Sequence, residues 1–180
     1  MSRIASEQYR AKVMSAEEAA KLIKHGDNVG FSGFTGAGYP KLVPVALAGQ
    51  IKAAHDRGDE FMIGCWTGAS TAPELAGELA AGAGISYRMP YQSDTHMRNK
   101  INAGISDYQD IHLSHSGPLV RGGFLGKLDV AVIEVTAITE EGEAIPSSSV
   151  GNNVAYMEAA EKIILEVNAW QSIDLDGMHD

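Results

Sequence analysis

The sequence predicts an open α/β domain in which a mostly parallel sheet carries helices on both faces. Two observations predict this fold class. Short apolar runs that read as strands alternate with amphipathic, helix-like segments, and such alternation is typical of parallel sheets. The strongest run, DVAVIEV at Asp129–Val135, is apolar and β-branched over most of its length, as expected of a strand buried on both faces.

A helix is predicted first, after a short polar start. Ser15–Glu18 has the S-x-x-E spacing of a capping box, which indicates a helix start, and Gly26 is the expected end of that helix. A short buried strand, Asn28–Phe31, follows and runs into the glycine loop Gly33–Gly38. The apolar face of the first helix is expected to carry Ala19, Leu22 and Ile23.

The next third of the chain repeats this alternation. Pro40 suits the first turn of a helix, and the apolar spacing that follows continues that helix. Phe61–Trp66 predicts a second strand and Thr71–Ala81 a second helix. A strand at Ile85–Met89 and a polar helix at Thr95–Ala103 come next. The buried positions expected for the helix after Pro40 are Val43, Leu47 and Ile51.

The last third is less regular. Residues 105–126 show no clear period and are expected to be irregular. Glu140–Glu143 predicts a turn after the DVAVIEV strand, with a hairpin returning through Ala144 and Ile145. Val154–Glu161 is expected to be helical, and Lys162–Val167 predicts another buried strand.

Length and charge exclude several classes of function. The 180 residues, 44% of them hydrophobic, fit one folded domain that spans residues 1–180, and the polar tail from residue 172 resembles the start of a further segment. The net charge of −9 argues against nucleic acid as a partner. No apolar run is long enough to cross a bilayer, so we expect no membrane association. The single cysteine and the absence of a signal-peptide pattern predict a cytoplasmic protein.

The glycine loop is the first candidate site. A strand, a G-x-x-G-x-G turn and a helix start place free N–H groups around one point, which favours an anion, although a tight turn alone also needs small residues. A third glycine in register is missing, the second strand ends without an acidic residue, and no G-K-[ST] motif exists, which disfavours NAD and ATP. The candidate binding residues in the loop are Thr35, Gly36, Ala37 and Gly38.

Two further turns are predicted at the same edge of the sheet. Thr67–Thr71 follows the second strand, and Ser93 follows the third, so both lie where ligands bind in open α/β sheets. The more common role of hydroxyls at such positions is to cap a helix, which applies to Ser70, Thr71 and Ser93 alike. Together the three turns are suited to a small carboxylate held by neutral donors.

The remaining chemically active residues give weaker signals. His112 and His115 are three apart, but no third ligand is near in sequence, so no metal site is expected. Cys65 lies in a strand and is expected to be buried and inert. Glu134 interrupts the DVAVIEV strand, either as a residue of the cleft or, as we favour, as a paired buried charge. The histidines expected at the surface are His25, His55 and His96.

Long matches in constant order identify a resemblance to a family. From about residue 4 to residue 170 the chain resembles the N-terminal half of the acetyl-CoA hydrolase/transferase family, and within it the succinyl-CoA:acetate CoA-transferases most. The segments that carry it are HGDNVGFSGFTGAGYPK (His25–Lys41), TGAST (Thr67–Thr71), MRNKINAG (Met97–Gly104), DVAVIEVTAITEEG (Asp129–Gly142), SSSVGN (Ser147–Asn152) and AEKIILEVNAWQ (Ala160–Gln171).

The resemblance implies a fold and a mechanism. Members of the family pack two Rossmann-like halves, of the NagB/RpiA-like type, around one active site. A glutamate carboxylate attacks the acyl-CoA thioester, and an acyl-glutamyl anhydride and then a glutamyl-CoA thioester carry the reaction. Coenzyme A is a substrate, and neither a metal nor another cofactor is implied. The glutamate belongs to the second half, so no catalytic residue is assigned in this chain.

The resemblance also implies roles for the first half. Ser70 matches a hydroxyl that contacts the substrate carboxylate, and the glycine loop matches the wall of the acyl pocket. Ser93 stands where relatives often have threonine, which keeps the hydroxyl and loses a methyl group.

Three hypotheses about function follow. The first is half of a CoA-transferase for small carboxylates, which needs a C-terminal catalytic half or a homo-oligomer as partner. The second is an acyl-CoA hydrolase, in which water resolves the intermediate. The third is a carboxylate-binding module without enzymatic activity, or a subunit that needs a partner chain.

Overall fold

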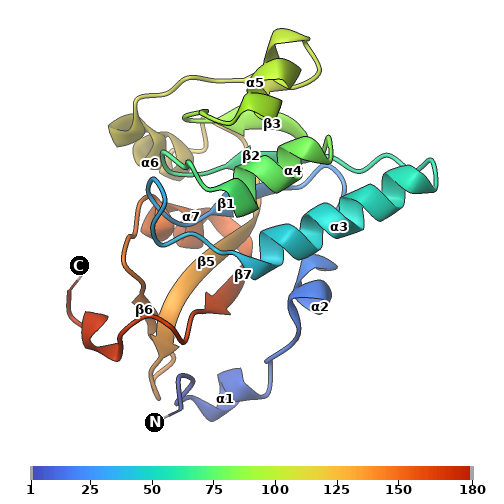
Figure 1. Cartoon of the computed structure of the whole chain (residues 1–180). Helices are drawn as coiled ribbons and strands as arrows, with labels where there is room; N and C mark the ends of the chain where they lie inside the picture. The colour runs from blue at the N-terminus through green and yellow to red at the C-terminus, as the bar shows by residue number, and fades with distance from the viewer. Residues whose placement is uncertain (1, 179–180) are drawn as a thin grey trace.

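The computed structural model describes residues 2–178, and over these residues seven strands form one sheet in the order β4-β3-β2-β1-β5-β6, with β7 beside β5 (Figure 1). The neighbours along β4-β3-β2-β1-β5 and the β5-β7 pair are parallel, and only β6 runs antiparallel to its neighbour. This confirms the predicted open, mostly parallel α/β sheet. The strands are β1 (Asn28–Phe31), β2 (Ile63–Trp66), β3 (Ile85–Met89), β4 (Asp107–Tyr108), β5 (Leu128–Ile138), β6 (Ala144–Pro146) and β7 (Ala160–Val167).

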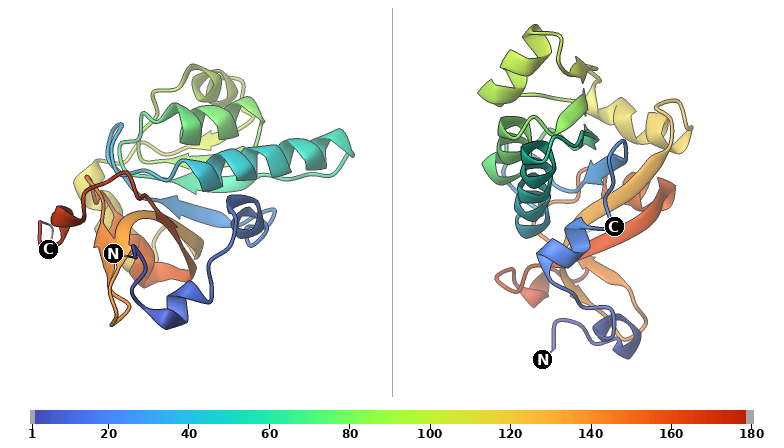
Figure 2. Two further views of the ribbon diagram at one scale, coloured as in Figure 1. Left: turned by 60° about the horizontal axis from the view of Figure 1, so that its bottom comes forward. Right: turned by 90° about the vertical axis from the view of Figure 1, so that its right-hand side faces the viewer.

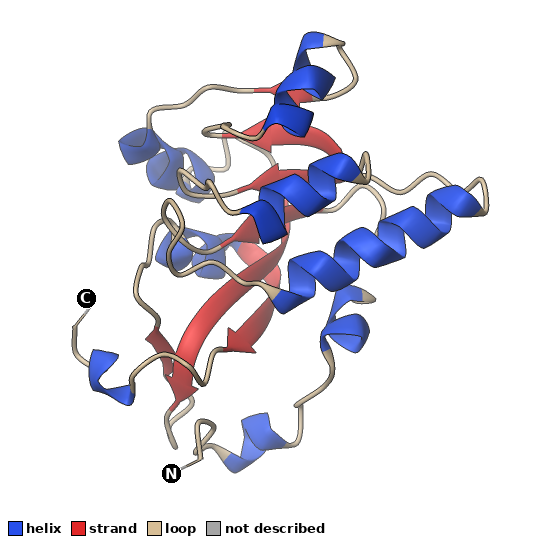
Figure 3. Ribbon diagram, viewed as in Figure 1, coloured by secondary structure: helices blue, strands red, loops and turns tan. Residues whose placement is uncertain are grey.

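Helices cover both faces of the sheet, because the parallel strands carry apolar side chains on both faces and these side chains must be shielded from water. In Figure 1, α3 and α4 lie in front of the sheet, and α6 and α7 lie behind it; Figure 3 shows the same layers by type of structure, and Figure 2 shows them from two other directions. The helices are α1 (Glu7–Arg10), α2 (Ala16–Ala20), α3 (Leu42–Asp56), α4 (Glu78–Ala81), α5 (Thr95–Asn102), α6 (Leu113–Arg121) and α7 (Asn153–Ala159), with a π-helical turn η1 (Pro73–Gly77) and a 3-10 turn η2 (Ile173–Leu175).

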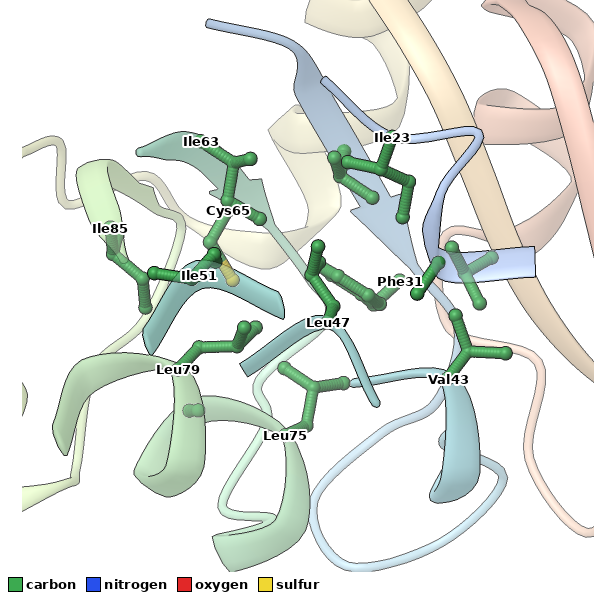
Figure 4. Packing of buried hydrophobic residues seen from close by; sticks show 14 of the residues in the cluster. Ile23, Phe31, Val43, Leu47, Ile51, Ile63, Cys65, Leu75, Leu79 and Ile85 are labelled. Carbon is green, nitrogen blue, oxygen red and sulfur yellow. The ribbon is translucent and has the colours of Figure 1, made fainter. Parts of the chain in front are cut away.

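The larger of two cores lies between the front helices and the sheet (Figure 4). Leu47 and Ile51 of α3 are fully buried against Phe31 of β1 and Ile63 of β2. Burying each such side chain contributes about 1.5–3 kcal/mol. Val43 is buried as well, so all three positions expected for this helix face the core.

The first two helices differ in detail from the prediction. The capping box is confirmed, since the Ser15 hydroxyl accepts from the Glu18 N–H and the Glu18 carboxylate accepts from the Ser15 N–H. The helix ends at Ala20, however, and not at Gly26, because tighter turns follow and leave Leu22 40% exposed. Pro40 was predicted in the first turn of α3 and instead precedes it, since Lys41 is the N-cap residue.

The prediction of an irregular segment at 105–126 is wrong. The segment contains β4, which extends the sheet beside β3, and the nine-residue helix α6. β4 has only two residues, too few to show an alternating pattern in the sequence. Gly117 and Pro118 have low helix propensity, so the sequence of α6 resembles a loop. The helix forms because its Val120 is buried in the second core, behind the sheet.

Other boundaries moved by a few residues. β3 has the predicted bounds, and the hairpin from β5 to β6 is confirmed. β2 begins at residue 63, β5 runs on to residue 138, and β7 takes two residues that were expected to be helical. The predicted helix 71–81 begins at Pro73 with the π-helical turn η1. Within residues 2–178, no helix combines the length and the apolar character needed to cross a membrane.

Candidate functional site

The loops that follow β1 and β2 meet at the carboxyl edge of the sheet, as predicted (Figure 1). The Thr35 N–H donates to the Ala69 carbonyl at 2.9 Å, and the Thr71 N–H donates to the Thr35 carbonyl at 3.3 Å. Thr35 reaches this position with a φ of 52°, in the left-handed region that residues with a side chain rarely adopt. The two turns therefore form one continuous surface.

Three backbone segments pack here at distances that only glycine allows. A Cβ atom on Gly68 would lie 2.3 Å from the Gly33 carbonyl oxygen, and one on Gly151 would lie 2.5 Å from the same oxygen. A Cβ atom on Gly38 would likewise lie 2.3 Å from the Ser149 carbonyl oxygen. The segments 33–38, 67–71 and 147–152, which together we call the edge cluster, are thus held in one fixed arrangement.

Ser32 anchors the glycine loop to the sheet. Its hydroxyl donates to the Gly38 carbonyl at 2.7 Å and accepts from the Glu134 N–H at 2.8 Å. Phe34 and Ala37 close a tight turn between them through two backbone hydrogen bonds. The tip of the loop, from Phe34 to Gly36, stays exposed at the edge of the sheet.

Ser70 lies within the edge cluster, but its hydroxyl is buried, with 2% of the residue exposed. The hydroxyl oxygen accepts from the Ala72 N–H at 3.3 Å, but Ala72 is itself the N-cap residue of η1 and no side chain caps that turn, so the capping role kept open for Ser70 and Thr71 is not observed. Among residues 2–178 this hydroxyl donates to no acceptor.

Ser93 follows β3 at the same edge and is half-buried. Its expected capping role is not observed, because Asp94 is the N-cap residue of α5 and accepts from the Met97 N–H at 2.9 Å. Within the described part of the chain, no hydrogen bond joins Ser93 and Ser70.

Arg88 is a buried charged residue beside the edge cluster that was not predicted from the sequence. It comes from β3, is 1% exposed, and donates from Nη1 to the Thr67 hydroxyl at 2.8 Å and to the Cys65 and Met89 carbonyls. The signal was visible: a single basic residue stands inside the apolar strand ISYRM, at Ile85–Met89.

Thr67 is held from its other side as well. Its carbonyl accepts from the Tyr156 hydroxyl at 2.7 Å and from the Asn152 side chain at 3.2 Å. Complete burial raises the pKa of Tyr156 well above its usual range, so this hydroxyl keeps its proton and remains a donor. Neither the Gly68 nor the Ala69 N–H donates to any other described residue.

Glu134 is a paired buried charge, as favoured. Its side chain is fully buried and accepts from Lys41 Nζ at 2.5 Å and from the Asn168 amide at 3.0 Å. Glu166, its register partner on β7, accepts from the N–H groups of Lys41, Leu42 and Val43 at the start of α3. Both carboxylates thereby hold the α3 end of the glycine loop.

Tyr39 completes this corner of the fold. Its carbonyl accepts from Lys41 Nζ at 2.8 Å, and its hydroxyl donates to Glu74 at 2.8 Å. Partial burial, and then the hydrogen bond to Glu74, raise the pKa of Tyr39 to about 12.

The structure also locates the remaining histidines and Cys65. No group of three residues that could hold a metal occurs in the described part of the chain, and His112 and His115 are exposed with their rings 5.5 Å apart. Cys65 is buried, and burial raises the pKa of its thiol. His25 and His96 are exposed, as predicted, whereas His55, also expected at the surface, is half-buried because its ring contacts the Phe61 carbonyl.

A groove of about 350 Å³ lies between the β5–β6 hairpin and α7, and Val150 of the edge cluster is among its lining residues. Its walls are mostly apolar and include Ile133, Val135 and Met157. Residues 176 and 177 of the tail also line it. The groove does not include the two candidate serines.

Solved structures share this fold. RipA from Yersinia pestis superposes with a TM-score of 0.71 at 18% identity, over 88% of this chain and 37% of that one. Glutaconate coenzyme A-transferase from Acidaminococcus fermentans gives a TM-score of 0.59 at 13% identity, over 92% of this chain and 68% of that one. At these identities the likeness concerns the fold alone.

Sequence relatives are closer. The chain is 43% identical, over 99% of its length, to a succinyl-CoA:acetate CoA-transferase of Clostridium kluyveri, and 40% identical over 86% to a propanoyl-CoA:succinate CoA transferase of Escherichia coli. An acetyl-CoA hydrolase of Schizosaccharomyces pombe is 38% identical over 99%. The chain spans 32–35% of the length of these relatives. Residues 1–180 match the acetyl-CoA hydrolase/transferase N-terminal domain, and the chain therefore belongs to that family.

Proposed function

We propose that this chain forms the acyl-pocket half of a CoA-transferase that moves CoA between a short-chain acyl-CoA and a small carboxylate such as acetate or succinate. The observation that carries the proposal is the edge cluster, where the glycine loop meets the turn of Ser70 at the carboxyl edge of the sheet. The 43% identity to a succinyl-CoA:acetate CoA-transferase supports this choice of reaction.

In the proposed mechanism this half binds and the other half reacts. The hydroxyl of Ser70, whose proton is not used among the described residues, donates a hydrogen bond to the carboxylate of the substrate, and so does the hydroxyl of Ser93. Residues 35–38 form the wall beside the acyl group.

A glutamate in a C-terminal half attacks the thioester carbonyl, which forms an acyl-glutamyl anhydride and releases the CoA thiolate. The thiolate attacks the glutamyl carbonyl of the anhydride, which forms a glutamyl-CoA thioester and releases the donor carboxylate. The acceptor carboxylate then attacks the glutamyl-CoA thioester, and the CoA thiolate that leaves attacks the acyl carbonyl of the new anhydride, which forms the product acyl-CoA and restores the glutamate. Glu134 takes no part as nucleophile, because it is buried and held by Lys41.

A direct test compares two proteins: the 180-residue chain, and the product of the complete reading frame that contains this sequence. We expect the longer product to transfer CoA from succinyl-CoA to acetate and the 180-residue chain to be inactive. Ser70→Ala in the longer product should raise KM for acetate more than KM for succinyl-CoA. Transfer at a comparable rate by the 180-residue chain would contradict the proposal.

Hydrolysis of acetyl-CoA is the second candidate, favoured by the relatives of 34–38% identity that are named acetyl-CoA hydrolases. The two reactions differ in their final acceptor, which is a carboxylate in transfer and water in hydrolysis. Release of free CoA from acetyl-CoA without any added carboxylate, at the rate seen with it, would identify the hydrolase.

A further inference from the structure

Arg88 is a fully buried cation that no carboxylate neutralises within the described part of the chain. The residue is 1% exposed, and its three hydrogen bonds run to two backbone carbonyls and one hydroxyl, all neutral acceptors. Its Nε atom is buried without any hydrogen-bond partner in residues 2–178, and the described ion pairs do not include it.

Such an arrangement is unusual for a guanidinium group. Arginine stays protonated in proteins, so burial cannot be relieved by losing the proton. Taking a charge out of water is unfavourable unless an opposite charge or a full set of hydrogen bonds replaces the water. Arg88 has only part of such a set, which leaves a positive potential in its surroundings.

The positive potential of Arg88 acts on the 67–71 turn, which contains Ser70. Arg88 Nη1 lies 2.8 Å from the Thr67 hydroxyl oxygen, and this hydroxyl in turn donates to the Gly68 carbonyl at 2.5 Å. The N–H groups of Gly68 and Ala69 follow directly and donate to no described residue. Two unused backbone donors beside a buried cation form an environment that favours an anion.

We propose that Arg88 sets the charge preference of the edge cluster: without touching the ligand, its guanidinium makes the 67–71 turn selective for a carboxylate over a neutral group of the same shape. The inference rests on the proposed function, because it concerns the same ligand. It replaces the expectation of a site built from neutral donors alone. Arg88 is a positioning residue in this scheme, since it acts through Thr67 and the local potential.

The test measures charge preference and not binding alone. The protein is the product of the complete reading frame, and the probes are acetate and acetamide, which have nearly the same shape and differ in charge. Ligand-detected NMR titration at constant ionic strength gives both dissociation constants. Arg88→Gln should weaken acetate binding about tenfold and leave acetamide binding unchanged, because only the anion interacts with the lost charge. Arg88→Lys should recover most of the affinity for acetate.

A matched control and a second variant complete the design. Arg57→Gln removes an equally charged but exposed side chain just past the far end of α3, and should leave both affinities unchanged. Thr67→Val keeps the guanidinium and removes the hydroxyl that links it to the turn, so it tests the proposal even if Arg88→Gln does not fold. We expect a smaller loss, about threefold, again for acetate only.

Each outcome decides one question. If Arg88→Gln or Thr67→Val weakens acetate and acetamide equally, or weakens neither, Arg88 only ties β2 to β3 and the inference is wrong. If the unmodified protein binds neither acetate nor succinate, the proposed function itself fails, and the inference fails with it.

Discussion

Two buried charged side chains on the same sheet differ in whether an opposite charge pairs with them. Glu134 of β5 is neutralised by Lys41 and also bonded by Asn168. Arg88 of β3 meets only neutral acceptors. In the first arrangement a cation neutralises the carboxylate through Oε2 and ties the start of α3 to the sheet, although Glu134 Oε1 is buried and accepts no hydrogen bond among the described residues. In the second, no described carboxylate balances the cation, and we propose that a bound carboxylate is stabilised by its positive potential without touching it.

The largest expected effect comes from breaking the ion pair of Glu134 and Lys41. Lys41→Met leaves the Glu134 carboxylate buried with only Asn168, and we expect the free energy of unfolding to fall by about 3 kcal/mol. Urea denaturation measures this loss. Adding Glu134→Gln to the same chain should restore most of the stability, because the uncompensated charge is then gone. A double variant as unstable as Lys41→Met alone would mean that the lysine acts by packing and not by charge.

The close packing of the edge cluster gives the next effect. Gly38→Ala places a Cβ atom 2.3 Å from the Ser149 carbonyl oxygen at a φ of 67°, and should cost about 2–3 kcal/mol of stability. Gly36→Ala is the matched control, since its Cβ would meet nothing closer than Thr71 at 4.0 Å. Thermal unfolding of both variants tests the contrast. Equal melting temperatures would show that the loop moves freely against residues 147–152.

A second carboxylate, Glu166, accepts hydrogen bonds from the start of a helix, and among the described residues no cation pairs with it. Glu166→Ala removes the acceptor for the first N–H groups of α3, and we expect a loss of about 1–2 kcal/mol in urea unfolding. Glu161→Ala, on an exposed part of the same strand, should change stability by less than about 0.5 kcal/mol. If the free energy of unfolding falls by the same amount in both variants, the hydrogen bonds between Glu166 and the start of α3 contribute little to stability.

The smallest expected effect concerns pH. The pKa of Tyr39 is about 12 in the folded chain and 10.0 by itself, so its contribution is fully present below pH 10 and is lost as the pH rises from 10 to 12. Tyr39→Phe should therefore make the decline of stability over this range slightly shallower. Unfolding free energies at several pH values measure the slope. An unchanged slope would mean that folding does not raise the pKa of Tyr39.

Local patterns were sufficient for much of the fold. The capping box at Ser15, the apolar run of β5 and the hairpin after it were all predicted from neighbouring residues. Local patterns were not sufficient at β4, which exists only because β3 offers it a partner. The bounds of α2 failed for the same reason, since tertiary packing decides where a short helix ends.

Part of the candidate site was also predictable. The meeting of the glycine loop with the 67–71 turn follows from the rule that carboxyl ends of parallel strands share an edge, and the structure confirms it. The contacts of Ser70, Ser93 and residues 35–38 with a substrate stay predictions. Arg88 was missed because its position in the sequence does not reveal whether a carboxylate lies opposite.

The sequence by itself determined the fold class, the family and the edge of the sheet at which the site lies, because periodicity and motif order are local properties. The tertiary structure alone decided which charges are compensated. Glu134 finds Lys41 across 93 residues, whereas no described carboxylate reaches Arg88. The compensation of a buried charge depends on what surrounds it in three dimensions, and the linear order of residues does not contain that information.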